Sequence, residues 1–171
     1  MKQLTHFDLQ NKKQQFPITI VCDAIRTPQN IGMCFRIAES FGVSMIYFHE
    51  NSPNVENHNV RRSARNTIYQ TQHAIYKNFK EIIQELKKEG NTIIGLEITD
   101  KSIDIQEFNF NNHEKLVLLV GSERKGIKNT TLLDYALSIP MYGRNSSMNV
   151  THCLSIALYE ATNQIKSSKV I

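Results

Sequence analysis

Two short apolar runs on either side of one helical segment constrain the fold of this chain most strongly. Residues 18–22 and 43–48 are rich in β-branched and aromatic side chains, as buried strands are. Between them, Thr27 and Pro28 indicate a helix start and Gly42 indicates its end. About eleven residues remain for the helix, enough for a crossover between parallel strands. The sequence therefore predicts a β-α-β unit.

The alternation of strands and helices continues through the rest of the chain. The clearest helix spans residues 78–89, because its apolar side chains recur at helical spacing before Gly90. Further strands are predicted over residues 92–98, 116–120 and 136–139. This order is typical of an α/β fold with a parallel sheet.

A terminal helix is predicted after Val150, and its apolar stripe is wide. The stripe comprises Val150, Cys153, Leu154, Ala157, Leu158, Ala161 and Ile165. A stripe of this width indicates packing against more than one neighbour.

Length and composition indicate one domain. The chain has 171 residues, 40% of them apolar, which is enough for one sizeable core. Residues 1–15 are polar and are expected to form a loosely held arm before a domain of residues 16–171. A net charge of +4 permits a polyanionic partner without requiring one.

Cellular location and metal content are expectations from absent signals. The three cysteines are widely spaced, so neither a disulfide framework nor a zinc site is indicated. The sequence shows no signal peptide and no apolar segment of membrane-spanning length. We expect a cytoplasmic protein without a metal or a membrane partner.

The first segment with unusual chemistry covers residues 30–42. On a helix, Arg36 lies over Gly32, one turn earlier, while Ile31, Phe35 and Ala38 share another face. A glycine beneath an arginine would leave room for a ligand. The alternative is that Asn30 caps the helix and Arg36 is a solvated charge.

The second segment, residues 116–127, is a buried strand that leads into a polar turn between Gly121 and Gly126. Open α/β sheets bind ligands at such strand ends, where backbone groups are exposed. A plain solvated turn is the alternative. The segment matches neither common phosphate-loop pattern.

The third segment, residues 139–150, leads into the terminal helix. Ser147 and Asn149 flank the helix start, where unpaired backbone N–H groups attract anions. Helix capping and a functional role explain these two residues about equally well.

The three segments together resemble the SpoU family, also called TrmH-like, among the knotted SPOUT methyltransferases. The matching text is N-I-G-x-x-x-R-x-A-x-x-F-G, L-V-G-S-E-x-x-G-I and I-P-M-x-G-x-x-S-S-M-N-V, at residues 30–42, 119–127 and 139–150. The resemblance covers about residues 16–165. It implies transfer of a methyl group from S-adenosyl-L-methionine to a ribose 2′-hydroxyl of structured RNA.

The resemblance also implies a fold and an assembly. Family members have a largely parallel six-stranded sheet flanked by helices, and their C-terminal helix forms a trefoil knot, a rare topology. They are homodimers in which the terminal helix and the first-motif helix pack across the two-fold axis. The wide apolar stripe after Val150 would then be covered by a partner subunit.

The family's cofactor loops fall on four positions of this chain. The residues that the resemblance assigns to S-adenosyl-L-methionine are Leu96, Glu97, Gly121, Glu123, Gly126, Ile139, Met141, Ser147 and Met148. No metal is implied, because the methyl donor is already activated by its positive charge.

The family's functional positions fall on Asn30, Arg36, Glu123, Ser147 and Asn149. Arg36 is implied either as the general base or as a cation that stabilises the developing alkoxide, since a guanidinium is normally only a donor. Asn30 would orient Arg36 or an RNA phosphate. Glu123 would organise its turn, and the last two residues would fix the cofactor loop and the ribose.

RNA contacts are expected from Arg61, Arg62, Arg65 and Arg144, with Lys12 and Lys13 as weaker candidates. A solvated charged loop is the alternative for each arginine. Relatives usually carry a glycine near Asn66, which is expected to keep the left-handed turn in its place.

The substrate is expected to be tRNA rather than rRNA, because no separate RNA-binding domain precedes the motifs. Three other functions stay open. The chain could be a non-catalytic RNA-binding paralogue, a knotted methyltransferase acting on a base, or a nucleotide-binding module. The complete five-residue set disfavours the first, Asn30 with Arg36 disfavours the second, and the missing phosphate loops disfavour the third.

Overall fold

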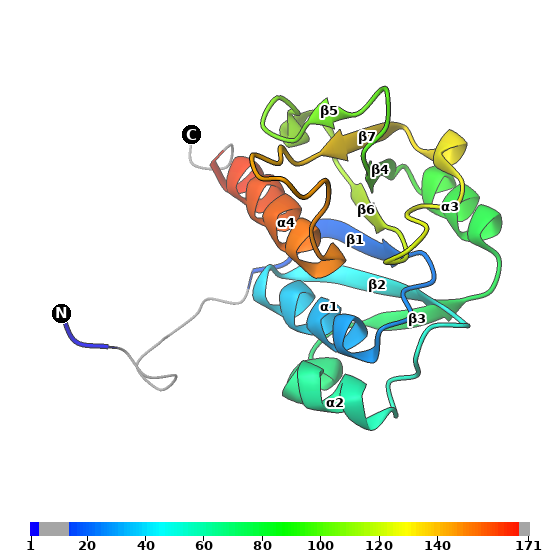
Figure 1. The fold of residues 1–171 in the computed structure, drawn as a ribbon, viewed down its shortest axis with the longest axis vertical. Coiled ribbons are helices and arrows are strands. Elements are labelled where there is room, and N and C mark those ends of the chain that lie inside the picture. Colours follow the sequence, from blue (N-terminus) through cyan, green and yellow to red (C-terminus); the bar gives the residue numbers. More distant parts are fainter. Residues whose placement is uncertain (4–13, 168–171) are drawn as a thin grey trace.

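The computed structural model describes residues 1–3 and 14–167. Its centre is a seven-stranded sheet of order β3-β2-β1-β6-β4-β7-β5 (Figure 1), and every described strand pair is parallel. The strands are β1 (Phe16–Cys22), β2 (Val43–His49), β3 (His73–Tyr76), β4 (Thr92–Leu96), β5 (Ile103–Asp104), β6 (Leu116–Val120) and β7 (Tyr135–Ser138). The predicted parallel α/β fold is confirmed, with seven strands where the resemblance implied six.

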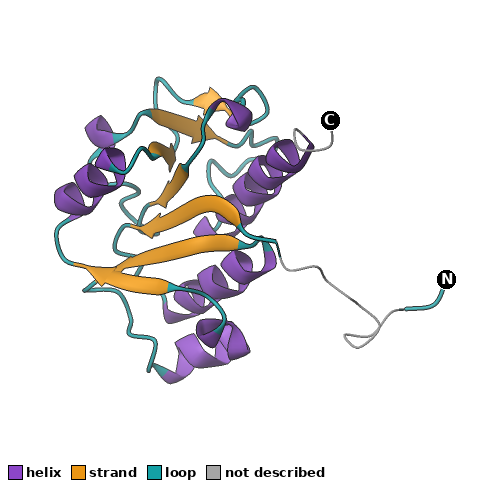
Figure 2. Cartoon of the chain, turned by 180° about the vertical axis from the view of Figure 1, so that it is seen from behind, coloured by secondary structure: helices purple, strands orange, loops and turns teal. Residues whose placement is uncertain are grey.

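Helices cover both faces of this sheet, as the two opposite views show (Figures 1 and 2). Side chains of α1 (Pro28–Ser40), α2 (His58–Ala64) and α4 (Val150–Ser167) pack in one apolar cluster, and those of α3 (Phe79–Lys88) pack in the other. Because successive strand residues point to opposite faces, β6 supplies Leu118 to the first cluster and Leu119 to the second. This explains the unbroken apolar run of β6, all of which is buried.

Helix α1 begins where Thr27 and Pro28 predicted its start. Thr27 occupies the N-cap position and Pro28 opens the helix, where a missing N–H group costs nothing. Asn30 therefore lies inside the first turn, so the alternative that made it the helix cap is wrong. Its side chain is buried and free to make tertiary contacts.

Gly32 does not leave room for a ligand, so the expectation from the sequence is wrong at this position. A Cβ atom at Gly32 would lie 2.1 Å from Ser63 Oγ and 2.5 Å from the Val60 carbonyl oxygen. Both atoms belong to α2, so the glycine lets the backbones of α1 and α2 approach closely. The residue serves helix packing.

The wide apolar stripe of α4 is largely covered within one subunit. Leu154, Ala157, Leu158, Ala161 and Ile165 are all buried in the core of the chain itself. The stripe therefore does not need a partner subunit to cover it, contrary to the expectation from the sequence. The apolar residues that α4 exposes are Ile156 and Tyr159, which are 39% and 62% exposed.

Two short strands and one α-helix were not predicted from the sequence. They are β3, β5 and α2, and none has the periodic apolar pattern that marks a buried strand or an amphipathic helix. Strand β3 forms by pairing in parallel with the second half of β2, from Ile46 opposite His73 to His49 opposite Tyr76. Pairing across more than twenty residues is a tertiary property.

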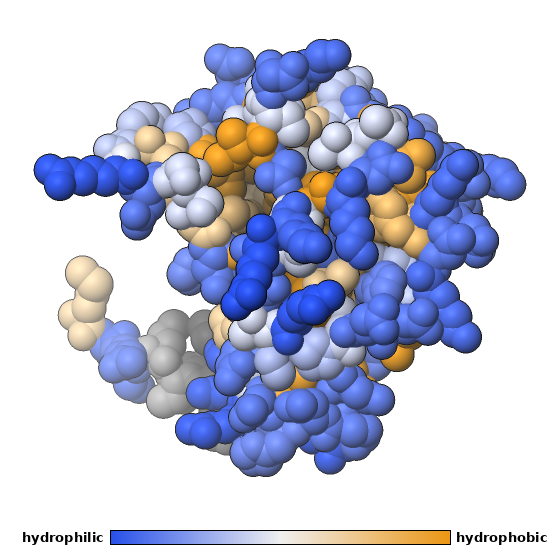
Figure 3. All heavy atoms as spheres, turned by 45° about the vertical axis from the view of Figure 1, so that its right-hand side comes forward, coloured by the Kyte–Doolittle hydropathy of each residue, from blue (hydrophilic) through white to orange (hydrophobic). Residues whose placement is uncertain are grey.

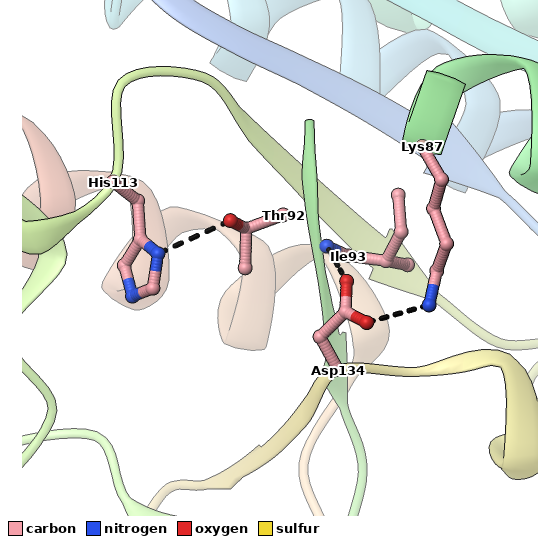
Figure 4. A network of polar contacts seen from close by, with 5 residues as sticks. All are labelled: Lys87, Thr92, Ile93, His113 and Asp134. Atoms are coloured by element: carbon pink, nitrogen blue, oxygen red, sulfur yellow. Dashed lines mark hydrogen bonds and ion pairs between the residues drawn. The ribbon is translucent and has the colours of Figure 1, made fainter. Parts of the chain in front are cut away.

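Charged and polar contacts lie at the amino ends of the central strands (Figure 4). Asp134 Oδ2 accepts a hydrogen bond of 2.8 Å from the Ile93 backbone N–H, and Lys87 Nζ lies 2.5 Å from Asp134 Oδ1. Thr92 Oγ1 lies 3.1 Å from His113 Nδ1. These contacts join α3, β4 and the start of β7.

Within the described ranges, no helix has the length and apolar character needed to cross a membrane.

Candidate active site

A cavity of about 300 Å³ lies at the carboxyl ends of β4, β6 and β7. This is the edge at which open parallel sheets bind ligands. All nine residues assigned to the cofactor by resemblance line it, namely Leu96, Glu97, Gly121, Glu123, Gly126, Ile139, Met141, Ser147 and Met148. The structure thus places four separate loops around one space, while their role in binding stays a prediction.

The turn after β6 is held closed by its own backbone. Ser122 and Gly126 exchange two hydrogen bonds, of 3.1 and 3.0 Å, as an isolated antiparallel bridge. A Cβ at Gly121 would lie 2.0 Å from the Gly126 carbonyl carbon. Gly126 itself has a φ of +60°, which side chains rarely permit. Both glycines are therefore required by the shape of the cavity wall.

Glu97 joins the loop after β4 to this turn. Its Oε2 atom accepts a hydrogen bond of 2.9 Å from the Ile127 backbone N–H, and Oε1 accepts one of 3.2 Å from Ile98. A Cβ at Gly126 would lie 2.2 Å from Glu97 Oε2. The carboxylate thus packs directly on the glycine, and part of its hydrogen-bonding capacity is used within the wall.

Glu123 joins the turn after β6 to the start of α1. Its Oε1 atom accepts hydrogen bonds from Asn30 Nδ2 at 2.8 Å and from the Thr27 backbone N–H at 3.0 Å. Its Oε2 atom accepts one of 3.2 Å from the Arg26 backbone N–H. Partial burial raises the pKa of Glu123, but these hydrogen bonds and one from its own backbone outweigh burial and lower it to about 2.

Asn30 connects this carboxylate to the third motif. Asn149 Nδ2 donates a hydrogen bond of 3.3 Å to Asn30 Oδ1. Asn149 Oδ1 in turn accepts bonds of 2.8 and 2.7 Å from the backbone N–H and the hydroxyl of Thr151, as a helix cap does. One buried amide therefore bridges the second and third motifs, and Asn149 serves both capping and the site.

Arg36 does not join this network. It lies six residues beyond Asn30 on α1, which is about 9 Å along the axis and on a different side of the helix. It does not line the cavity. The expectation that Asn30 orients Arg36 is wrong within one subunit, because the side-chain amide of Asn30 is hydrogen-bonded to Glu123 and Asn149. Ser147, by contrast, is exposed on the cavity wall.

The expected RNA-binding arginines differ in their environments. Arg61, Arg62 and Arg65 are all exposed in or just after α2, and Arg61 forms an ion pair with Glu56. Arg144 is exposed in the segment before α4. The left-handed backbone expected at Asn66 occurs one residue earlier, at Arg65, which has a φ of 54°. Lys12 and Lys13 lie outside the described residues.

Sequence reasoning missed three exposed basic residues on the loops next to the cavity. Arg26, Arg124 and Lys125 are exposed on the two loops that Glu123 joins, and Arg124 also lines the cavity. Arg124 and Lys125 lie within the second motif and Arg26 lies just before the first, and these positions could have identified them. Figure 3 shows that hydrophilic side chains cover most of one face of the molecule, with apolar residues visible between them.

The fold and the cavity are those of one class of protein. A parallel sheet with helices on both faces, and a ligand-sized cavity at its carboxyl edge, is the architecture of ligand-binding α/β enzymes. The chain belongs to the SpoU rRNA Methylase family, whose model matches residues 17–159. The family predicted from the motifs is thereby confirmed.

Similar proteins act on more than one class of RNA. A tRNA (guanosine(18)-2′-O)-methyltransferase of Saccharomyces cerevisiae is 32% identical, over 94% of this chain and 12% of the relative. A 23S rRNA (guanosine-2′-O-)-methyltransferase of Coxiella burnetii is 30% identical, over 90% of this chain and 61% of the relative. The chain therefore spans less than two thirds of either relative.

A solved structure shares the fold. The SpoU methyltransferase AviRb from Streptomyces viridochromogenes, in complex with the cofactor AdoMet, has a TM-score of 0.80 and 24% identity, over 95% of this chain and 65% of the other. At that identity the similarity bears on the fold alone.

Proposed function

We propose that this chain transfers a methyl group from S-adenosyl-L-methionine to a ribose 2′-hydroxyl of structured RNA. The observation that carries the proposal is the cavity at the sheet edge, with Asn30, Glu123 and Asn149 joining the three motif segments beside it. Both curated relatives are named for 2′-O-methylation, which supports a ribose rather than a base as the target.

The lining of the cavity fits this cofactor. Leu96, Ile139, Met141, Met148 and Val150 provide apolar surface for an adenine ring and a methionine chain. Loop backbone and the polar residues Ser122 and Ser138 provide hydrogen-bonding groups. When bound, the cofactor supplies a methyl group on a positively charged sulfur. Glu97 and Glu123 add negative charge to the same wall.

The residues of the chain then have two tasks, which are to align the ribose and to accommodate its proton. Alignment would come from the rigid wall that Glu97 and Glu123 fix. Arg36 carries a guanidinium, which is a donor at neutral pH. We therefore assign it the stabilisation of negative charge on the 2′-oxygen, with the proton passing to another acceptor.

This role requires a second subunit, and we propose that the protein acts as a homodimer. Arg36 does not line the cavity of its own subunit. Helices α1 and α4 contact each other, and α4 exposes Ile156 and Tyr159. A two-fold contact through these helices would cover both apolar side chains and carry Arg36 toward the cavity of the partner.

The test is to incubate the protein with methyl-deuterated S-adenosyl-L-methionine and, separately, tRNA and rRNA. Nucleosides from the digested RNA are then mapped by mass. We expect labelled 2′-O-methylnucleosides, and we propose tRNA as the substrate because the yeast relative, the more similar of the two, modifies tRNA.

Other outcomes of this experiment discriminate the alternatives. Label in rRNA alone would correct the substrate, and label on a base would correct the target atom. RNA binding without any label in either RNA would mean a non-catalytic RNA-binding protein. Failure to bind S-adenosyl-L-methionine or S-adenosylhomocysteine at millimolar concentration would overturn the cofactor assignment.

A further inference from the structure

A second cavity, of about 320 Å³, lies beside β2 and β3. Its walls come from the end of β2, from the loop that follows, and from β3. Phe48, Val55 and Ile75 give it apolar surface, and Glu50, Ser52 and His73 give it polar groups. Ile75 is 61% exposed, so an apolar side chain stands at the open side of this cavity. Nothing in the mechanism above uses these residues.

Two of the polar groups can accept hydrogen bonds. Glu50, the residue that follows β2, is exposed and carries a carboxylate. His73 Nδ1 lies 3.2 Å from the Thr71 carbonyl oxygen, which can only accept, so Nδ1 carries the hydrogen. In the neutral ring, Nε2 is then an acceptor. The edge contact with Phe35, at 4.9 Å between centroids, holds the ring in place.

The cavity lies at the same edge of the sheet as the proposed active site. In the order β3-β2-β1-β6-β4, the pair β3–β2 and the pair β6–β4 are three strand spacings apart, or about 14 Å. That distance corresponds to roughly four stacked nucleotides at 3.4 Å each. Helix α2, with the exposed Arg62, begins soon after the loop that lines the cavity. One RNA strand can therefore reach both sites.

We propose that this second cavity holds an unstacked nucleobase of the RNA substrate, at a position near the methylated nucleotide. The inference rests on the proposed function for the identity of the RNA. Glu50 and His73 Nε2 accept hydrogen bonds, so the cavity favours a base with an exocyclic amino group. Phe48, Val55 and Ile75 would contact the faces of the base. Cytosine then binds better than uracil.

The first part of the test uses Glu50→Gln with Glu85→Gln as its matched control. Both variants remove one exposed negative charge, and Glu85 lies on α3 and does not line the cavity. Each fold should therefore be about as stable as the wild type. We expect Glu50→Gln to raise the KM for RNA about fivefold, with the KM for S-adenosyl-L-methionine unchanged. Glu85→Gln should change neither KM, and equal RNA kinetics for the two variants would overturn the proposal.

The second part is independent of methyl transfer. Cytidine and uridine 5′-monophosphate are titrated into the full chain, and backbone amide resonances are followed by NMR. Cytidine monophosphate should shift resonances of residues 50–55 and 73–76 and bind about fivefold more tightly than uridine monophosphate, and Glu50→Gln should remove that preference. Shifts confined to the β4–β6–β7 cavity, equal binding of the two nucleotides, or no shifts at millimolar concentration would each overturn the proposal. A chain that passes this titration but methylates no RNA would retain the base site while losing the proposed function.

Discussion

The side-chain amide of Asn30 donates a hydrogen bond of 2.8 Å to the carboxylate of Glu123, across 93 residues of sequence. Asn30 belongs to α1, and Glu123 belongs to the turn after β6. Because the oxygen of the same amide accepts a bond from Asn149, one buried side chain sets the relative positions of three loops.

Asn30→Asp should be more damaging than Asn30→Ala. Both remove the donor to Glu123, but the aspartate also places a second carboxylate beside one that already lies 2.8 Å from Nδ2 of Asn30. We expect Asn30→Ala to lower the free energy of unfolding by about 1–3 kcal/mol and to weaken S-adenosyl-L-methionine binding. Urea denaturation and calorimetry measure the two effects. Equal stability of both variants at pH 7 would contradict the prediction.

Arg36→Ala should leave the fold and cofactor affinity nearly intact, since Arg36 lies outside the cavity of its own subunit. Single-turnover methyl transfer should fall by at least about a hundredfold. Arg36→Lys keeps the charge without the planar fork, so substantial recovery would favour charge stabilisation. Full activity of Arg36→Ala would show that the arginine is an ordinary solvated side chain.

Mixing subunits tests the position of Arg36 across the dimer. When Arg36→Ala and Asn149→Ala chains are combined, a mixed dimer contains one site with neither substitution if Arg36 acts on the partner's cavity. Activity should then exceed that of either variant alone. No gain, with mixed dimers verified by mass, would place Arg36 in its own subunit's site.

Glu123 should make stability depend on acidic pH. Its pKa in the folded chain is lowered to about 2, below the ordinary value near 4.3. The stabilisation is therefore complete above the unfolded pKa and is lost as pH falls from about 4.3 toward 2. Glu123→Gln should flatten the decline in Tm over this window. A pH profile identical to the wild type would show that another group dominates.

RNA affinity should depend unequally on the arginines of α2. All three are exposed, and Arg61 is paired with Glu56. Replacing Arg62 and Arg65 by alanine should weaken RNA binding and reduce the slope of log K against log salt by about 1.5. Arg61→Ala is the matched control and should have a smaller effect. Fluorescence anisotropy over a salt series gives both quantities, and equal slopes for all chains would assign the cluster to solvent.

Local sequence patterns were sufficient to predict the layered parallel fold and the loops that surround the cavity. Buried strands such as Leu116–Val120 and the amphipathic helix Phe79–Lys88 carry their pattern locally, because burial on two faces or one face fixes which side chains are apolar. The glycine-bracketed turn after β6 also marks a strand end directly. For these elements, local chemistry and the tertiary fold agree.

The roles of Asn30, Gly32 and the α4 stripe depend on tertiary contacts that local patterns do not encode. An asparagine near a helix start looks like a cap in sequence, but Asn30 bonds to residues 93 and 119 positions away. Gly32 serves the approach of α2, a helix too short to carry a periodic pattern. The α4 stripe could pack on its own core or on a partner with the same composition, because apolar burial is not directional. Its own core covers most of it.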